Sequence, residues 1–366
     1  MHQFSAPCSR YIVSVALTLI RVAQRLQLVF RSDIVVTQHA ACSMQHAAVS
    51  SGNFKTDEAF LENPTRIYVY LNIKTVNDMI ISSSYAVQGA ADKRVFNYID
   101  TSLGQLHYAE SGAGEAMILL HQTPRSLDEF AEVQPLLASR WRTIAMDMYG
   151  FGQSAKFAAP QTVEKYAQGV LELVNALNIE KFSILGHHTG MFVASEVAAI
   201  APERVTAVVL SAGDVVDAEF REAMEALDVD VAETREDGSH LMELWRKRLN
   251  LYPSGNPDVL NRFIRDALAP GVTPLEGHLA VARYDMENRV GLVKAPVLVL
   301  AATDDPVTYS RTQVVVDAYC NSCFVSRAEI KGGGIPLMEL KFKEVASAVH
   351  GFFEHLECNV IGMKRD

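Results

Sequence analysis

The chain has 366 residues, of which 49% are hydrophobic and 21% charged, the balance of an ordinary globular protein with enough apolar material for a sizeable core. Its formal net charge of −10 argues against nucleic acid or an anionic membrane surface as a partner, because both would repel the chain. The five cysteines, an odd number at irregular spacing, do not indicate a disulfide framework and favour a reducing, cytoplasmic compartment.

The first 78 residues differ from the remainder of the chain. They contain no acidic residue before Asp33 and no repeating strand or helix pattern. The apolar run Ile12–Ile20 is too short to span a bilayer before Arg21 interrupts it, so no membrane span is expected. This composition fits an organellar transit peptide better than a signal peptide, but we favour a disordered tail or a gene-model extension, with the fold starting near Met79.

From Arg94 onward, apolar runs and alternating patterns predict strands that are separated by amphipathic helices. The first two strands form an antiparallel hairpin around Ser102–Gly104. The predicted strands are Val95–Ile99, Gln105–Glu110, Ala116–His121, Trp141–Met146, Phe182–Leu185, Val205–Ser211, Pro296–Ala301 and Phe324–Ile330, and the predicted helices are Phe130–Ser139, Val163–Asn178, Met191–Ala199 and Glu339–Leu356. This alternation predicts a three-layer α/β/α fold with a mainly parallel eight-stranded sheet.

More than eighty residues without a strand pattern separate the strand ending at Ser211 from the one beginning at Pro296. A structureless loop of that length is implausible, so the segment is predicted to be a helical lid over the strand ends. Its predicted helices are Ala218–Leu227, His240–Leu249, Pro257–Leu268 and Gly277–Glu287. We therefore expect a core of residues 79–213 and 294–366 with a lid of residues 214–293.

The stretch Phe182–Gly190 predicts a buried strand, a sharp turn and the start of a helix. Its centre, Gly186–Gly190, has the sequence Gly-His-His-Thr-Gly. Paired glycines at this spacing suit a nucleophile elbow, in which the middle residue has a strained backbone and the glycines let strand and helix approach closely. The middle residue here is His188 instead of serine.

Residues from about Val95 to Phe353 resemble the α/β-hydrolase superfamily, because three further motifs of that superfamily occur along the chain in the superfamily's order. The stretch from His121 to Pro124 resembles its H-G-x-P turn, and Asp147-Met-Tyr-Gly-Phe-Gly-Gln-Ser154 matches its D-x-x-G-x-G-x-S turn. The stretch from Ala301 to Pro306 resembles the loop that carries the acid of the catalytic triad. The resemblance implies the α/β-hydrolase fold with a helical cap.

The resemblance also implies site residues, with departures from the usual triad. Asp305 matches the triad acid, whereas Ile335 stands at the position of the triad histidine and Gln122 replaces the glycine of the H-G turn. The backbone N–H of Thr189 and that of Gln122 or Thr123 are the expected oxyanion-hole donors. A serine-type acyl-enzyme mechanism is not expected, because neither a hydroxyl at residue 188 nor a base at residue 335 is present.

An imidazole reaches farther than a serine hydroxyl, so His188 is predicted to approach Asp305 directly and to form a general-base dyad. We predict a cofactor-free, metal-free enzyme that hydrolyses a small ester, lactone or other carbonyl compound. A lyase, decarboxylase or isomerase on the same scaffold remains an alternative, as does a ligand-binding pseudoenzyme. The isolated pair Cys320 and Cys323 does not indicate a zinc or redox site.

Five more residues are possible pocket residues, and each has a structural alternative. His121 could instead brace its loop, and Arg125 could pair with Asp128 or Glu129. Asp214 could be a helix N-cap, and His278 and Tyr284 could pack within the lid. His187 is expected to point away from the pocket and to pack.

Overall fold

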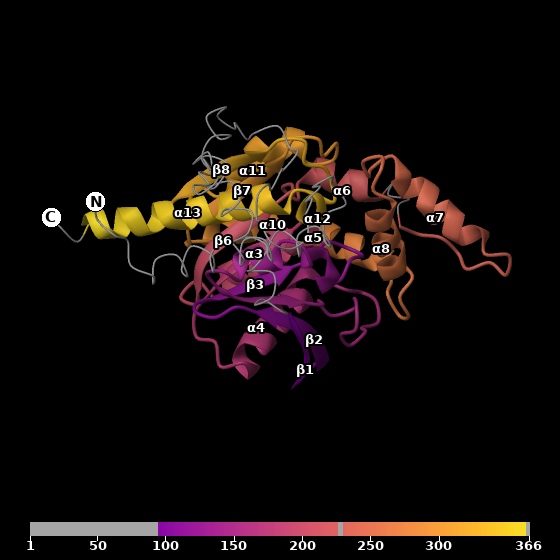
Figure 1. Ribbon diagram of the computed structural model, residues 1–366, viewed down its shortest axis with the longest axis horizontal. Coiled ribbons are helices and arrows are strands. Elements are labelled where there is room, and N and C mark those ends of the chain that lie inside the picture. Colours follow the sequence, from indigo (N-terminus) through magenta and orange to yellow (C-terminus); the bar gives the residue numbers. More distant parts are fainter. Residues whose placement is uncertain (1–93, 226–229, 364–366) are drawn as a thin grey trace, which may run out of the picture. The chain divides into compact units, whose positions relative to one another are not determined.

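The computed structural model describes the backbone of residues 94–225 and 230–363, which belong to one compact unit spanning residues 90–366 (Figure 1). The predictions for residues 1–78 and for a start at Met79 lie outside the described residues. In the part of the chain that the structure describes, no helix is both long and apolar enough to cross a membrane.

A single sheet of eight strands lies at the centre of the described unit (Figure 1). Its spatial order is β1-β2-β4-β3-β5-β6-β7-β8, in which β2 pairs antiparallel with β1 and β4 and all other neighbours are parallel. The strands are β1 Val95–Thr101, β2 Gly104–Ser111, β3 Ala116–Leu120, β4 Arg142–Met146, β5 Phe182–His187, β6 Val205–Ser211, β7 Val297–Ala302 and β8 Val325–Ile330. The eight predicted strands and the predicted fold class are confirmed, with bounds that shift by at most two residues.

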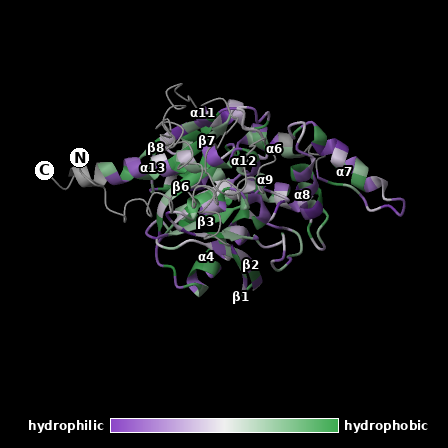
Figure 2. Ribbon diagram, viewed as in Figure 1, coloured by the Kyte–Doolittle hydropathy of each residue, from purple (hydrophilic) through white to green (hydrophobic). Residues whose placement is uncertain are grey.

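The central strands are apolar along their length because helices cover both faces of the sheet. All residues of β3, β5 and β7 are buried, and Ile118 of β3 is aligned with Ile144 of β4 and Ile184 of β5. Figure 2 shows the hydrophobic residues gathered on these inner strands. Their carboxyl ends meet at one edge of the sheet, where ligands of open α/β sheets usually bind.

Alternate strand residues point to opposite faces and enter two separate hydrophobic clusters. On one face they pack against α4 Val163–Ala176, α5 Thr189–Ile200 and α11 Thr312–Ala318. On the other face they pack against α3 Gln134–Leu137, α12 Leu337–Leu340 and α13 Phe342–Met363. The predicted helix Phe130–Ser139 is divided into a 3-10 turn, η2 Leu127–Phe130, and α3, because Pro135 begins a new turn.

The segment between β6 and β7 is helical, and residues 214–293 of it are called the insertion from here on. Its helices are α6 Ala218–Glu225, α7 Ser239–Leu249, α8 Pro257–Ala267, α9 Pro274–Ala282 and α10 Met286–Arg289, followed by η3 Val290–Leu292. Helices α7 and α8 share a small hydrophobic cluster, which Ile335 of the core joins. Ile335 therefore packs against the insertion.

Candidate active site

His188 lies in the sharp turn between β5 and α5, beyond the carboxyl end of the strand. Its backbone has φ 45° and ψ −114°, a region that non-glycine residues rarely adopt. The turn is tight because Gly186 and Gly190 have no side chains. A Cβ on Gly186 would lie 2.0 Å from the carbonyl oxygen of Gly190, and one on Gly190 would lie 2.1 Å from that of Leu120. Strand β5, helix α5 and the end of β3 therefore meet at His188.

The imidazole of His188 approaches Asp305, which lies in the loop after β7. His188 Nε2 is 3.3 Å from Asp305 Oδ2, close enough for an ion pair. The N–H direction does not meet the angle of a hydrogen bond, so Nε2 is buried without a hydrogen-bond partner.

The carboxylate of Asp305 is 2% exposed and is held by its own loop. Oδ1 accepts hydrogen bonds from the backbone N–H of Val307 (2.8 Å) and Thr308 (3.3 Å), and Oδ2 accepts one from the Thr308 hydroxyl (2.7 Å). Burial alone would raise the pKa of Asp305, but the His188 imidazole and these donors outweigh it and lower the pKa. Asp305 is therefore an ionised, fixed partner for an imidazole.

The three backbone N–H groups expected to stabilise an oxyanion, those of Gln122, Thr123 and Thr189, differ in the hydrogen bonds that they make. The N–H of Gln122 donates to Glu129 Oε2 at 2.8 Å and is thus occupied by a buried carboxyl group, which removes Gln122 from the set of free donors. The N–H of Thr123 donates to the hydroxyl of Thr189 at 3.2 Å, and that hydroxyl donates to Thr123 Oγ1 at 3.0 Å. The Thr189 N–H opens helix α5, where a backbone donor has no partner within the helix.

Two further histidines at this edge of the sheet are fully buried and brace loops. His121 Nε2 accepts a hydrogen bond from the Met148 N–H at 3.0 Å, so its proton lies on Nδ1, which donates to the Gln122 carbonyl at 2.8 Å. Burial lowers the pKa of His121. His187 lies between the Ser211 hydroxyl and the Ile335 carbonyl, both at 3.0 Å, and burial beside His188 lowers its pKa to about 3. Both imidazoles are neutral and structural.

Arg125 is not a substrate-binding residue, because its guanidinium is completely buried among acidic side chains. It forms ion pairs with Asp266 of α8 and, at 3.0 Å, with Glu339 of α12. Asp128, a partner that the sequence suggested, lies farther away at 3.6 Å. The cluster joins the core to the insertion, and no sequence pattern pointed to its distant members.

The structure also corrects the expectations for Asp214 and Tyr284. Asp214 pairs with Arg311 at 2.9 Å, and it is Asp217 that caps α6, through a 2.9 Å bond to the Phe220 N–H. Tyr284 is buried and donates its hydroxyl hydrogen to Glu196 of α5 at 2.9 Å, within the main core. Tyr284 is therefore not available to a substrate, and the Asp214 carboxylate is held in an ion pair.

His278 lies in α9, and its imidazole contacts a carboxylate. Its Nε2 is 2.8 Å from Oδ2 of Asp230, a carboxylate that sequence reasoning missed. Arg248 of α7 forms an ion pair with the same carboxylate. Asp230 lies ten residues before the start of the predicted helix His240–Leu249, in a charged, aperiodic stretch, and only the folded insertion brings the three residues together.

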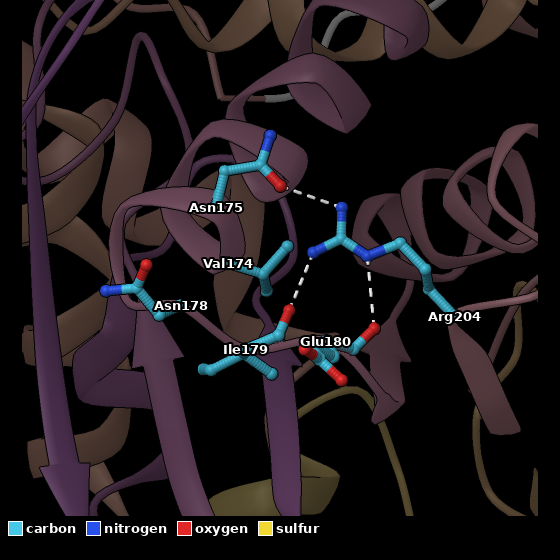
Figure 3. Close-up of a pocket in the computed structure, with 6 residues that line it drawn as sticks. All are labelled: Val174, Asn175, Asn178, Ile179, Glu180 and Arg204. Atoms are coloured by element: carbon cyan, nitrogen blue, oxygen red, sulfur yellow. Dashed lines mark hydrogen bonds between the residues drawn. The ribbon is translucent and has the colours of Figure 1, made fainter.

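A surface pocket of about 450 Å³ lies far from these residues (Figure 3). It is lined by the end of α4 and by Arg204, which precedes β6, and so it lies at the amino ends of the parallel strands. The Arg204 guanidinium donates to Asn175 Oδ1, to the Ile179 carbonyl and to the Glu180 carbonyl at 2.7, 2.7 and 3.2 Å. This arginine ties the end of α4 to the residues that precede the sheet strand β5.

Metal ligands and reactive thiols are not gathered at the site. Among the described residues, no cluster of three or more histidine, cysteine, aspartate or glutamate side chains has an arrangement suited to a metal ion. Cys320 and Cys323 are exposed free thiols near the amino end of β8, at the opposite edge of the sheet from His188.

Comparison with known proteins agrees with this architecture. Residues 115–334, more than half of the chain, match the family described as alpha/beta hydrolase fold. A soluble epoxide hydrolase of Corynebacterium sp. (strain C12) is 37% identical over 90 residues, 25% of this chain and 32% of that protein. (E)-2-((N-methylformamido)methylene)succinate hydrolase of Acinetobacter baylyi is 25% identical over 207 residues, 55% of this chain and 76% of that protein.

Solved structures extend the similarity in fold. The crystal structure of E-2-(acetamidomethylene)succinate hydrolase has a TM-score of 0.60 at 18% identity and covers 72% of this chain and 100% of that chain. By sequence, the chain spans about a third of the length of the curated relatives that it matches at 37% to 38% identity. Together with the eight-stranded sheet, the family match over residues 115–334 shows that the chain belongs to the alpha/beta hydrolase fold family.

Proposed function

We propose that the protein is a cofactor-independent hydrolase of a small ester, lactone or related carbonyl compound, and that His188 and Asp305 are its general-base dyad. The observation that carries the proposal is the 3.3 Å approach of His188 Nε2 to a buried carboxylate that its own loop holds ionised. The relatives named above are hydrolases by name, which supports the reaction class.

In the proposed reaction, Asp305 keeps the proton of the imidazole on Nε2 and leaves Nδ1 of His188 as the base. Nδ1 removes a proton from water as the water oxygen attacks the substrate carbonyl carbon. General-base assistance of this kind contributes on the order of 10²–10⁴-fold to the rate. The turn at His188 serves as the elbow, because its strained backbone presents the side chain beyond the strand end.

The developing oxyanion is stabilised by two backbone N–H groups, those of Thr189 and Thr123. In the free protein the Thr189 hydroxyl occupies the Thr123 N–H at 3.2 Å, near the long limit of a hydrogen bond. The substrate oxygen displaces this hydroxyl when it binds. The position of Thr189 N–H at the first turn of α5 adds the positive end of the helix dipole.

The dyad is tested with three variants on a panel of esters and lactones. His188→Ala should lose on the order of 10²–10⁴-fold in kcat with little change in KM. Asp305→Asn should also lose activity strongly, because an amide does not hold the imidazole in the required tautomer. The matched control is Asp304→Asn, since the neighbouring Asp304 is exposed and its carboxylate bonds only to the Thr303 hydroxyl in the described contacts.

Turnover in ¹⁸O-water separates hydrolysis from the other chemistries of this scaffold. Activation of water by His188 places one ¹⁸O atom in the carboxylic acid product at each turnover. Product formation without ¹⁸O would assign the dyad to proton abstraction in a lyase, decarboxylase or isomerase. Full activity of His188→Ala on the best substrate of the panel would refute the role of His188.

A further inference from the structure

A second carboxylate–imidazole pair lies in the insertion and is better aligned than the pair in the core. His278 Nε2 and Asp230 Oδ2 form a 2.8 Å hydrogen bond, whereas His188 and Asp305 are 3.3 Å apart without one. Asp230 is 3% exposed, and Arg248 binds both of its carboxylate oxygens. The Arg248 guanidinium itself stacks over the Phe263 ring at 4.4 Å, so Asp230 is held rigidly.

The hydrogen bond to Asp230 determines the role of each ring nitrogen of His278. Because the carboxylate accepts the Nε2 proton, Nδ1 is left to interact with other groups, and it makes no hydrogen bond within the described residues. The His278 side chain is 17% exposed, the same fraction as that of His188, so it is reachable by a small molecule. Burial would raise the pKa of Asp230, but His278 and Arg248 outweigh burial and lower it, which keeps the carboxylate ionised.

Helix α9 places His278 beside the proposed oxyanion donors. A Cβ on Gly277 would lie 2.6 Å from Thr123 Oγ1, so the helix backbone rests directly on Thr123. Consecutive Cα atoms are about 3.8 Å apart, so the Cα of His278 lies within about 8 Å of the Thr123 hydroxyl. Thr123 in turn bonds to Thr189, the residue after His188.

We propose that His278 is the general acid of the reaction, which protonates the leaving group, and that Asp230 is its positioning residue. The inference rests on the proposed function, in which His188 removes a proton from the attacking water. His278 enters this step protonated on both ring nitrogens. As the tetrahedral intermediate breaks down, the bond between the carbonyl carbon and the leaving-group oxygen breaks, its electron pair takes the Nδ1 proton, and His278 is left as a neutral imidazole whose Nε2 proton stays hydrogen-bonded to Asp230. His188 then returns its proton to solvent and His278 takes one up, so the net reaction adds one water.

His278 and His188 are assigned different roles because their surroundings differ. The buried Asp230 carboxylate contacts both His278 and Arg248, so an imidazolium at His278 has an anionic partner in direct contact. The core lacks an imidazole at residue 335, where Ile335 packs against the insertion. An acid that approaches from the insertion side can therefore act on the leaving group while His188 acts on water.

The test compares an acetate ester that has an alkoxide leaving group with p-nitrophenyl acetate. An alkoxide needs a proton to leave, whereas p-nitrophenolate leaves unaided. His278→Gln should lose about 10²-fold or more in kcat/KM on ethyl acetate and less than about 5-fold on p-nitrophenyl acetate. Asp230→Asn should show the same selectivity with a smaller loss. Added imidazole should restore ethyl acetate hydrolysis by His278→Ala, with melting curves run to confirm that each variant is folded.

The matched control is His240→Gln, which removes an insertion histidine whose Nδ1 accepts from the Arg235 N–H at 3.2 Å in a solvent-exposed turn. It should leave both esters unaffected. An equal loss on the two esters, or no loss on either, in folded His278→Gln would overturn the general-acid role. Failure of the proposed function is distinguishable, because it appears as full activity of His188→Ala on both esters. Hydrolysis of neither ester by the wild-type chain would count against both proposals.

Discussion

Replacing Arg125 with methionine should reveal how strongly the buried ion-pair cluster joins the insertion to the core. Methionine roughly keeps the length of the side chain but removes the only positive charge in direct contact with both Asp266 and Glu339 at a fully buried position. Burial by itself would lower the pKa of Arg125, but Glu339, Asp266 and Glu129 outweigh it and raise the pKa. Asp266 and Glu339 therefore lose their fully buried cationic partner in this variant.

The expected cost is that of breaking a buried ion pair by removing one partner, about 3–5 kcal/mol of unfolding free energy. For a unit of this size, each kcal/mol lowers Tm by about 2–4 °C, so we expect a decrease of about 10 °C. Urea unfolding can be followed by the fluorescence of Trp141 in the core and Trp245 in α7, which together report on both sides of the cluster.

The matched control is Arg265→Met in the same cluster. Arg265 pairs with Asp266 and Asp128, but its side chain is 56% exposed, so its loss should cost less than about 1 kcal/mol. In the triple variant Arg125→Met, Asp266→Asn and Glu339→Gln, part of the lost stability should return, because the uncompensated charges are gone. A cost below about 1 kcal/mol for Arg125→Met alone would refute the reasoning.

Three further predictions concern other parts of the structure. Burial, together with the nearby Glu339, raises the pKa of Glu129 to about 8, so the folded state binds this proton more tightly than the unfolded state. Wild-type stability should therefore fall by up to about 1.4 kcal/mol per pH unit as the pH rises from about 5 to about 8, whereas Glu129→Gln should lack this component in pH-dependent urea titrations. Gly277→Ala should reduce kcat and lower the unfolding free energy by about 1–3 kcal/mol, because the new Cβ meets Thr123. Gly351→Ala, whose Cβ meets open space in α13, should raise the unfolding free energy by up to about 1 kcal/mol. Equal Tm values for the two variants would contradict this. His188→Gly should be more stable than His188→Ala by about 1 kcal/mol in thermal melts because of the positive φ, although neither should turn over substrate.

The order of the strands and the helical character of the insertion were predictable from the sequence because they depend on local periodicity, whereas helix α11, between β7 and β8, was not predicted. Fully apolar runs such as Ala116–Leu120 predict buried parallel strands, and the glycines of Gly186–Gly190 predict the turn at His188. The prediction placed Asp305 after β7 and the insertion after β6, and these follow from chain order alone. Helix ends were less certain, as Phe130–Ser139 shows, because short turns compete with weak helix nucleation.

The partners of charged side chains were decided by the tertiary structure. Arg125 meets Asp266 and Glu339 across 141 and 214 residues of sequence, and His278 meets Asp230 across 48. A local pattern specifies which face of a helix is apolar, but not which carboxylate from another element arrives opposite an arginine or an imidazole. Such pairs form only after strands and helices have packed, since burial then makes an unpaired charge too costly and selects the arrangement in which every charge has a partner.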